Sequence, residues 1–288
     1  MDTKKFPRTI VGGISLPRML IGTNWMMGWS HKTPSFDKMA AERSRNKETI
    51  ADIICEFLSF GIDAIMGPIS QFLLITEGIK LAEERTGKKV IVIDTPRVNM
   101  RDTAEARREA KEIIKDSRDA GSTFCLPHHS CVEQLVNKQT ETIDRLPDYL
   151  YMIREQGMIP GLSAHMPELI LYSDEQGYDV ETYIQIYNCM GYMMQVEIEH
   201  VFNVISSAKK PVMTIKSMAA GRVTPFVGIS FSFATLRECD MVTVGCLTPE
   251  EVAEDVEISL AVLERRPAKL GLRGSPFDDG KIFQVHTN

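Results

Sequence analysis

The chain of 288 residues is 43% hydrophobic and 25% charged, and its formal net charge is −6. This length and composition allow a sizeable core without disulfide or metal staples. The acidic balance argues against nucleic acid or an anionic membrane as the main partner. No apolar run approaches the roughly 18 to 20 residues that a membrane span needs, and none follows Met1–Lys5 as a signal peptide requires.

The cysteines and the absence of linkers indicate how the chain is organised. Six cysteines are spread along it without a C-x-x-C pair, which is typical of reduced thiols rather than of a disulfide framework. We therefore expect a cytoplasmic protein. No Ser/Gly-rich linker interrupts residues 18–266, so we expect a single domain over residues 1–288, ending in an extended tail at about 267–288.

Short β-rich runs alternate with longer amphipathic segments. In chain order, the sequence predicts strands at Met19–Thr23, Ala64–Gly67, Val90–Asp94, Thr123–Leu126, Ile159–Leu162, Tyr183–Tyr187, Val212–Ile215 and Met241–Gly245. Helical periodicity between the strands is clearest at Lys47–Phe60, Thr103–Ala120 and Pro249–Arg265. Several helices end in a glycine just before the next strand, namely at Gly61, Gly87, Gly121 and Gly157.

This alternation predicts a parallel sheet with right-handed crossovers, most simply closed into an α/β (β/α)8 TIM barrel. An open doubly wound sheet is the alternative, but Gly22–Trp25 after the first strand lacks the Gly-x-Gly-x-x-Gly pattern. Barrel active sites lie at the C-terminal ends of the strands. Three of the six histidines fall at these ends, namely His128, His129 and His165.

Several segments resemble the aldo-keto reductases. The resembling segments are Gln156–Ser163 at the entry to the family's fifth strand, Tyr183–Asn188 at its sixth, Pro211–Arg222 at its seventh and Val244–Glu251 at its eighth. Gly22-Thr23 and Gly61-Ile62 are similar to its earlier segments, so the match spans nearly the whole chain. The resemblance implies a barrel of aldo-keto reductase type.

The resemblance also implies a catalytic Asp–Tyr–Lys–His tetrad, in which a tuned tyrosine donates the proton. Carried over by position, the Asp falls on Met66, the Tyr on or near Gln71 and the Lys on Pro96. Only the histidine remains, as His128. The chain therefore resembles a divergent member of the fold that lacks three of the four catalytic residues.

In the nicotinamide site that the resemblance implies, Ser163 and Gln185 are retained, while Ala164 replaces an asparagine and Ile215 a stacking aromatic. Any such cofactor would also meet the loop glycines, Gly221 and Gly245. Glu250 and Glu251 occupy the loop that reads the 2′-phosphate of NADP, and carboxylates repel that phosphate. We therefore expect NAD(P) to be disfavoured.

We predict that His128 and His165 are catalytic acid or base groups, because neutral imidazole serves this role near neutral pH. Asp94 is their predicted partner, if it points into the barrel as a buried carboxylate. The alternatives are a histidine that only orients a carbonyl and a structural ion pair of Asp94 with Lys216 or Arg97. A divalent metal also stays open, although no His-x-His or His-x-x-x-His pair is present.

Lys216 can form a Schiff base if it is desolvated, but we favour a charge that positions an anionic ligand. The loop Asn24–Asp37 contains both tryptophans and is either a substrate lid or an oligomer contact. The residues that we expect to bind substrate are Asn24, Trp25, Arg97, His129, Asn188 and Lys216.

Three functions stay open from the sequence. The first is a non-redox enzyme, an isomerase, epimerase or lyase, that acts on a small oxygenated metabolite. The second is a divergent NAD(P)-dependent oxidoreductase, and the third is a catalytically silent ligand-binding barrel. In each case we expect a small-molecule ligand and no nucleic acid or membrane partner. A homo-oligomer is possible.

Overall fold

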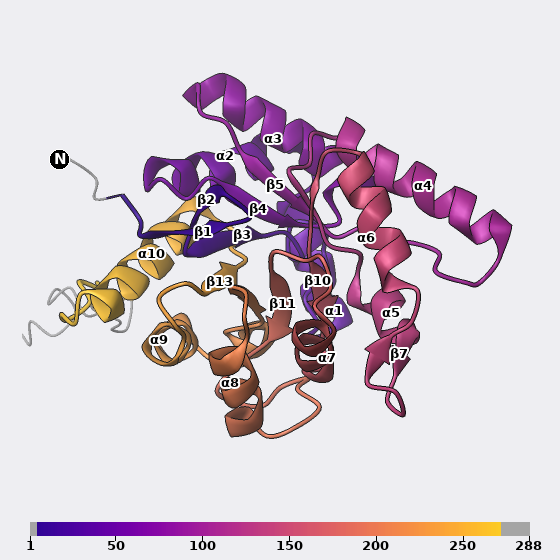
Figure 1. Cartoon of the computed structure of the whole chain (residues 1–288). Coiled ribbons are helices and arrows are strands. Elements are labelled where there is room, and N and C mark those ends of the chain that lie inside the picture. The colour runs from indigo at the N-terminus through magenta and orange to yellow at the C-terminus, as the bar shows by residue number, and fades with distance from the viewer. Residues whose placement is uncertain (1–4, 272–288) are drawn as a thin grey trace, which may run out of the picture.

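The central sheet closes into a barrel of parallel strands (Figure 1). A computed structural model describes residues 5–271, so most of the expected tail lies outside the described residues. The strands are β3 (Met19–Gly22), β4 (Ala64–Gly67), β5 (Ile91–Asp94), β6 (Phe124–Cys125), β9 (Ile159–Pro160), β10 (Leu162–Ala164), β11 (Tyr183–Ile186), β12 (Val212–Ile215) and β13 (Met241–Val244). They pair in the order β10-β11-β12-β13-β3-β4-β5-β6-β9.

The two edge strands of this sheet, β9 and β10, are halves of one strand. Only Gly161 separates them, so the nine segments correspond to the eight strands of a closed barrel. A Cβ at Gly161 would lie 2.8 Å from the side chain of Leu126 and from the carbonyl oxygen of Thr182. A side chain at this position would collide with both neighbouring segments, so glycine is needed where the strand is interrupted. The predicted (β/α)8 barrel is confirmed.

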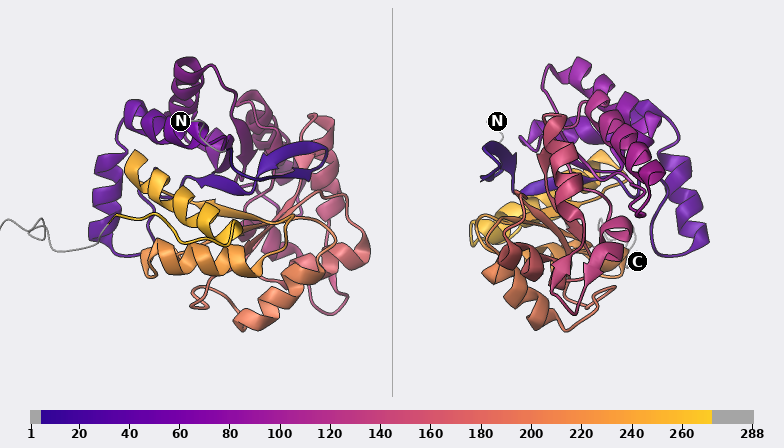
Figure 2. Two further views of the ribbon diagram at one scale, coloured as in Figure 1. Left: turned by 90° about the vertical axis from the view of Figure 1, so that its left-hand side faces the viewer. Right: turned by 45° about the vertical axis from the view of Figure 1, so that its right-hand side comes forward.

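Within residues 5–271, eight of the helices follow strands of the barrel, and these helices cover its outside (Figures 1 and 2). They are α2 (Lys47–Ser59), α3 (Leu73–Thr86), α4 (Ala104–Asp119), α6 (Leu146–Glu155), α7 (Glu168–Gln176), α8 (Ile198–Ser207), α9 (Pro225–Thr235) and α10 (Pro249–Leu263). The side chains of Asn46, Thr103 and Thr248 cap the first turns of α2, α4 and α10. Among the described residues, no helix is long and apolar enough to cross a membrane.

The interior of the barrel is filled by large apolar side chains, including Leu20, Phe124 and Met213. An N-terminal hairpin, β1 (Arg8–Val11) and β2 (Ile14–Pro17), adds Val11 and Leu16 to the same cluster. It turns at Gly12-Gly13, whose φ angles are 54° and 82°, as a two-residue hairpin loop requires. The hairpin fills the end of the barrel opposite the pocket and was not predicted from the sequence.

Two short helices and a second hairpin lie in the loops between these elements. Helix α1 (Pro34–Arg43) follows the loop after β3, and α5 (His129–Val132) begins directly after β6. A small hairpin, β7 (Val136–Asn137) and β8 (Thr142–Ile143), continues the loop from α5 towards α6. These elements lie in segments for which the sequence pattern predicts no regular structure.

Candidate active site

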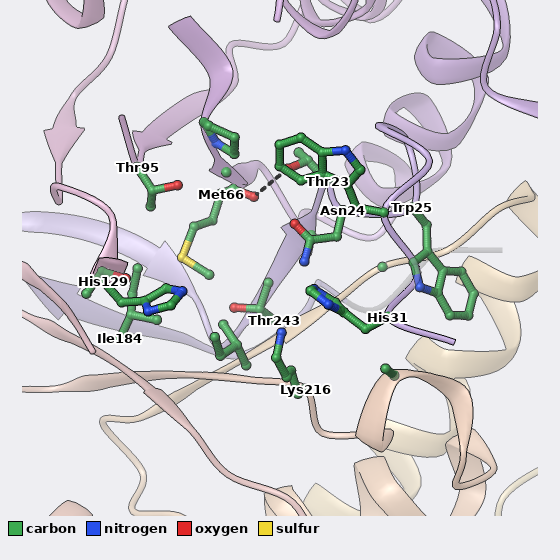
Figure 3. A pocket seen from close by; sticks show the side chains of 18 of the residues that line it. Thr23, Asn24, Trp25, His31, Met66, Thr95, His129, Ile184, Lys216 and Thr243 are labelled. Atoms are coloured by element: carbon green, nitrogen blue, oxygen red, sulfur yellow. Dashed lines mark hydrogen bonds between the residues drawn. The ribbon is translucent and has the colours of Figure 1, made fainter. Parts of the chain in front are cut away.

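A pocket of about 360 Å³ lies at the C-terminal ends of the barrel strands. Its floor consists of side chains that point into the barrel, among them Met66, Ile184 and Thr243 (Figure 3). Loops that follow the strands form its walls. The volume is that of a small-molecule site, and the location is the one at which barrel enzymes carry out their chemistry.

Most of the predicted site residues meet in this pocket. Its lining includes Asn24, Trp25, Arg97, His128, His129, Ser163, His165, Lys216, Gly221 and Gly245. It does not include Asp94, Gln185 or Asn188. The roles of the lining residues stay predictions, whereas the three residues outside the lining require correction.

Asp94 points away from the pocket. Its neighbour Ile93 packs inside the barrel, and because successive strand residues face opposite sides, Asp94 faces the helix layer. Its carboxylate accepts a 3.2 Å hydrogen bond from the backbone N–H of Ser70, and the hydroxyl of Ser117 on α4 also faces it. Asp94 is thus neither a partner of the pocket histidines nor paired with Lys216 or Arg97.

An Asp94→Asn substitution is expected to preserve ligand binding and to stabilise the fold at neutral pH. Burial raises the pKa of Asp94, so the folded state holds this proton more tightly than the unfolded state does. The free energy of unfolding is therefore highest below the unfolded pKa and falls as the pH rises through the folded pKa. Denaturant unfolding of both proteins at acidic and neutral pH measures the effect, and an equal loss of stability at both pH values would contradict it.

Gln185 and Asn188 hold the backbone rather than face the pocket. Both are fully buried. The Gln185 amide donates to the carbonyl oxygen of His165 at 3.1 Å. Asn188 closes a turn by accepting from the N–H of Tyr192 at 2.9 Å and donating to its carbonyl oxygen at 3.0 Å. The predicted contacts of Gln185 with a cofactor and of Asn188 with a substrate are therefore corrected to structural roles.

The predicted histidines form a stacked row along one wall. The rings of His129 and His165 stack with centroids 3.5 Å apart and an interplanar angle of 17°. The ring of His128 lies 4.2 Å from that of His129 on the other side. His129 is thus the middle ring and reaches the cavity wall that faces Met66 (Figure 3).

Glu133 supports the middle ring and is absent from the site residues predicted from the sequence. One of its carboxylate oxygens lies 3.4 Å from Nδ1 of His129, and the other accepts hydrogen bonds from the backbone N–H groups of His165 and Met166. Burial alone would raise the pKa of Glu133, but these hydrogen bonds outweigh it and hold the pKa below its ordinary value. The i,i+4 spacing of His129 and Glu133 was the available signal.

The outer two histidines are neutral at physiological pH. Burial, reinforced by the repulsion that neighbouring imidazolium groups in this row would experience, lowers the pKa of His128 to about 4 and that of His165 to about 3. Nδ1 of His128 accepts a hydrogen bond from the backbone N–H of Ser130. The proton of the neutral ring is therefore on Nε2, which makes His128 a hydrogen-bond donor towards a ligand.

Lys216 is a desolvated cation in the pocket. Burial lowers its pKa to about 8, and no described residue bonds to its ammonium group. Its side chain and those of Asn24 and His31 point towards one another (Figure 3). Burial, with the nearby charge of Lys216, lowers the pKa of His31. His31 was predicted only as part of the lid loop, because its position in a long loop has no periodicity that would indicate its direction.

The loop after β3 covers the mouth. Trp25, Trp29 and His31 from this loop line the pocket. The carbonyl oxygen of His31 accepts hydrogen bonds from the Tyr192 hydroxyl at 3.1 Å and from the Arg222 guanidinium at 2.9 Å. Arg97 lies over the Trp29 ring at 5.7 Å. The loop is thus fixed to the opposite wall of the pocket, and its role as a substrate lid or as an oligomer contact stays a prediction.

The charged side chains that line the pocket are positive. Lys216 and Arg97 contribute positive charge, and no Asp, Glu or Tyr belongs to the lining within residues 5–271. Glu133 is one layer behind the lining, and its carboxylate is directed at the backbone N–H groups of His165 and Met166 and at His129. A pocket of this kind attracts an anionic ligand.

The residues do not fit the nicotinamide cofactor that the resemblance to aldo-keto reductases implies. Gln185 is turned away from the pocket, and Ala164 packs in the outer core. Glu251 accepts a hydrogen bond from the Leu247 N–H, so the loop that would read the 2′-phosphate of NADP offers a carboxylate rather than a cation. Over the part of the chain that the structure describes, no group of three His, Cys, Asp or Glu residues could hold a metal ion.

Comparisons with known proteins agree with the architecture. The sequence matches no protein-family profile and no curated protein sequence. A candidate aldo-keto reductase from Pseudomonas aeruginosa has a TM-score of 0.64 at 13% identity, covering 91% of this chain and 98% of that chain. Aldose reductase from Giardia lamblia has a TM-score of 0.52 at 15% identity, covering 88% and 89%.

Barrels with other activities are also similar. Orotidine 5′-monophosphate decarboxylase from Methanocaldococcus jannaschii has a TM-score of 0.50 at 14% identity, covering 86% of this chain and 98% of that chain. At identities this low, the likeness establishes the fold alone. The chain is a (β/α)8 barrel, and a fold shared by barrels of several activities does not indicate its reaction.

Proposed function

We propose that the chain is a non-redox enzyme of isomerase, epimerase or lyase type that acts on a small anionic oxygenated metabolite. The observation that carries this proposal is the His129–Glu133 pair in a pocket whose described lining has no tyrosine. A carboxylate-supported histidine is suited to move a proton, whereas reduction by the fold family relies on the tyrosine that is missing here.

In the proposed proton transfer, His129 is the base and His128 is a hydrogen-bond donor. The Glu133 carboxylate accepts from Nδ1–H of His129, which leaves Nε2 of His129 as the base. His128, whose pKa is about 4, stays neutral and donates Nε2–H to a carbonyl or hydroxyl oxygen of the substrate. A neutral donor beside a supported base is an arrangement that serves proton removal next to a carbonyl group.

Arg97 is our candidate for recognition of the anion. It lines the pocket from the rim, where its contact with Trp29 at 5.7 Å limits its freedom. A planar guanidinium binds carboxylate and phosphate groups through paired hydrogen bonds. We therefore place the anionic end of the substrate near Arg97 and its reactive carbon nearer the histidines and Lys216.

An Arg97→Met substitution is expected to weaken anion binding about tenfold or more, the loss of roughly 1.5 to 3 kcal/mol for a charge-assisted hydrogen bond. Isothermal titration with pyruvate and with dihydroxyacetone phosphate measures the change. Arg101→Met is the control, because Arg101 is exposed and lies outside the pocket lining. Equal affinities for the two variants would remove Arg97 from the recognition site.

A fluorescence titration tests the proposal as a whole. The only tryptophans of the chain are Trp25 and Trp29, and both line the pocket, so their emission reports on its occupancy. We expect saturable changes with small anionic carbonyl compounds and none with micromolar NADPH or NADH. Saturable binding of NADPH in the micromolar range would contradict the non-redox assignment and favour an oxidoreductase.

A further inference from the structure

We infer that Lys216 is a covalent nucleophile that forms an imine with the carbonyl group of a small anionic aldehyde or ketone. This inference rests on the proposed function and names its substrate class. Its basis is the position of Lys216 in the pocket, the absence of a bonded partner for its ammonium group among the described residues, and the groups around it.

The backbone holds Lys216 in a set position. It follows directly after β12 and has a φ of 63°, which is uncommon for a residue with a side chain. Ala219 and Ala220 in the same turn also have positive φ values, of 48° and 55°. Gly228 of α9 packs against this turn, since a Cβ there would lie 2.5 Å from the carbonyl oxygen of Ser217. A strained, closely packed turn of this kind is typical of functional sites.

The surroundings of Lys216 lack the carboxylate partner that a purely structural buried lysine has. A buried ammonium is normally paired with a carboxylate, yet no Asp or Glu lines this pocket within the described residues. The titratable and charged groups that line the same pocket are His31, His128, His129, His165 and Arg97. None of them supplies a negative charge that would hold the ammonium form, so burial favours the uncharged amine. The pKa of about 8 agrees with this, because it leaves a reactive fraction of free amine near neutral pH.

The step balances without an added oxidant or reductant. The lone pair of Nζ forms a bond to the carbonyl carbon while the C=O electrons move to oxygen. One proton passes from nitrogen to this oxygen, and a second comes from the solvent, which took it up when the ammonium group became the free amine. The oxygen leaves as water, and a protonated C=N bond forms. His129 then removes a proton from the adjacent carbon, whose electron pair forms a C=C bond while the C=N electrons return to nitrogen, which gives a neutral enamine. Reprotonation of the enamine and hydrolysis of the imine release the product and return the lysine.

Reductive trapping tests the inference. The full-length protein is incubated with pyruvate or with dihydroxyacetone phosphate, sodium borohydride is added, and the adduct is located by peptide mass spectrometry. We expect a single secondary amine on Lys216 with at least one probe, which also tells a carboxylate from a phosphate substrate. The extent of trapping should rise with pH around a midpoint near the Lys216 pKa of about 8.

Two variants separate Lys216 from other lysines. Lys216→Arg keeps the charge but cannot form an imine, so the adduct should disappear while binding of the probes by tryptophan fluorescence is retained. Lys32→Arg is the control, because Lys32 is at the lid, 4.3 Å from the Phe36 ring, and outside the pocket lining. The adduct should persist in this variant.

Two results would overturn the inference. One is the absence of any adduct with both probes at concentrations that saturate the fluorescence signal. The other is labelling scattered over surface lysines and unchanged in Lys216→Arg. The proposed function is tested apart from this, because proton exchange that depends on His129 would survive in either case and would identify an enzyme without a covalent lysine.

Discussion

The His129→Gln variant is expected to lose about 10²- to 10⁴-fold in the rate of proton transfer to a bound substrate, the usual contribution of a general base. Glutamine keeps a polar side chain of similar reach but cannot accept and release a proton. The measurement is the exchange of the methyl protons of pyruvate in D₂O, followed by NMR. Glu133→Gln should show a smaller loss, because it removes the carboxylate that orients the ring but leaves the ring in place.

His200→Gln is the matched control for this experiment. His200 is exposed on α8 and lies outside the pocket lining, so its substitution should leave the exchange rate unchanged. A rate in His129→Gln within a factor of about two of the wild type would remove His129 from the mechanism. If His128→Gln alone abolished exchange, the base would be the outer histidine and the role of Glu133 would be structural.

The largest expected loss of stability follows substitution of Asp240, at the end of the barrel opposite the pocket. Asp240 is fully buried. One carboxylate oxygen accepts from the backbone N–H of Val212 at 2.8 Å and from the Arg237 guanidinium at 2.7 Å. Removing it leaves the charge of Arg237 without its partner, so Asp240→Ala should reduce the free energy of unfolding by roughly 3 to 5 kcal/mol.

Urea denaturation of Asp240→Ala and of Asp52→Ala provides the comparison. Asp52 pairs with Arg85 at 2.7 Å, but its side chain is 59% exposed, so its loss should change the free energy of unfolding by about 1 kcal/mol or less. Similar losses in the two variants would show that the buried network around Asp240 contributes no more than a surface ion pair.

The fold was predictable because its signals are local and repeated. Each strand is a short apolar run, and glycines such as Gly61 and Gly157 mark the ends of helices. Because barrel sites lie at the C-terminal strand ends, the strand pattern alone was enough to predict that the histidines and Lys216 meet. The N-terminal hairpin also has a signal in the sequence, Gly12-Gly13 between two apolar runs, although no strand was predicted there.

The errors concern the direction in which side chains point. In Ile91–Asp94 every residue before Asp94 is apolar, so alternation could not show whether Ile93 or Asp94 faces the barrel interior. Asn188 was read as a ligand contact because it follows a strand, but a polar side chain there can equally satisfy backbone groups of the next turn. Direction and local hydrogen bonding depend on tertiary packing, which sequence pattern alone does not determine.

The most direct test of the proposed function is the exchange of carbon-bound hydrogen by the wild-type protein in D₂O without added nicotinamide. We expect exchange next to the carbonyl group of pyruvate or dihydroxyacetone phosphate, catalysed by the wild-type protein and by His200→Gln but not by His129→Gln. Absence of exchange with both compounds, together with NADPH-dependent reduction of either, would contradict the proposal that this pocket performs non-redox proton transfer.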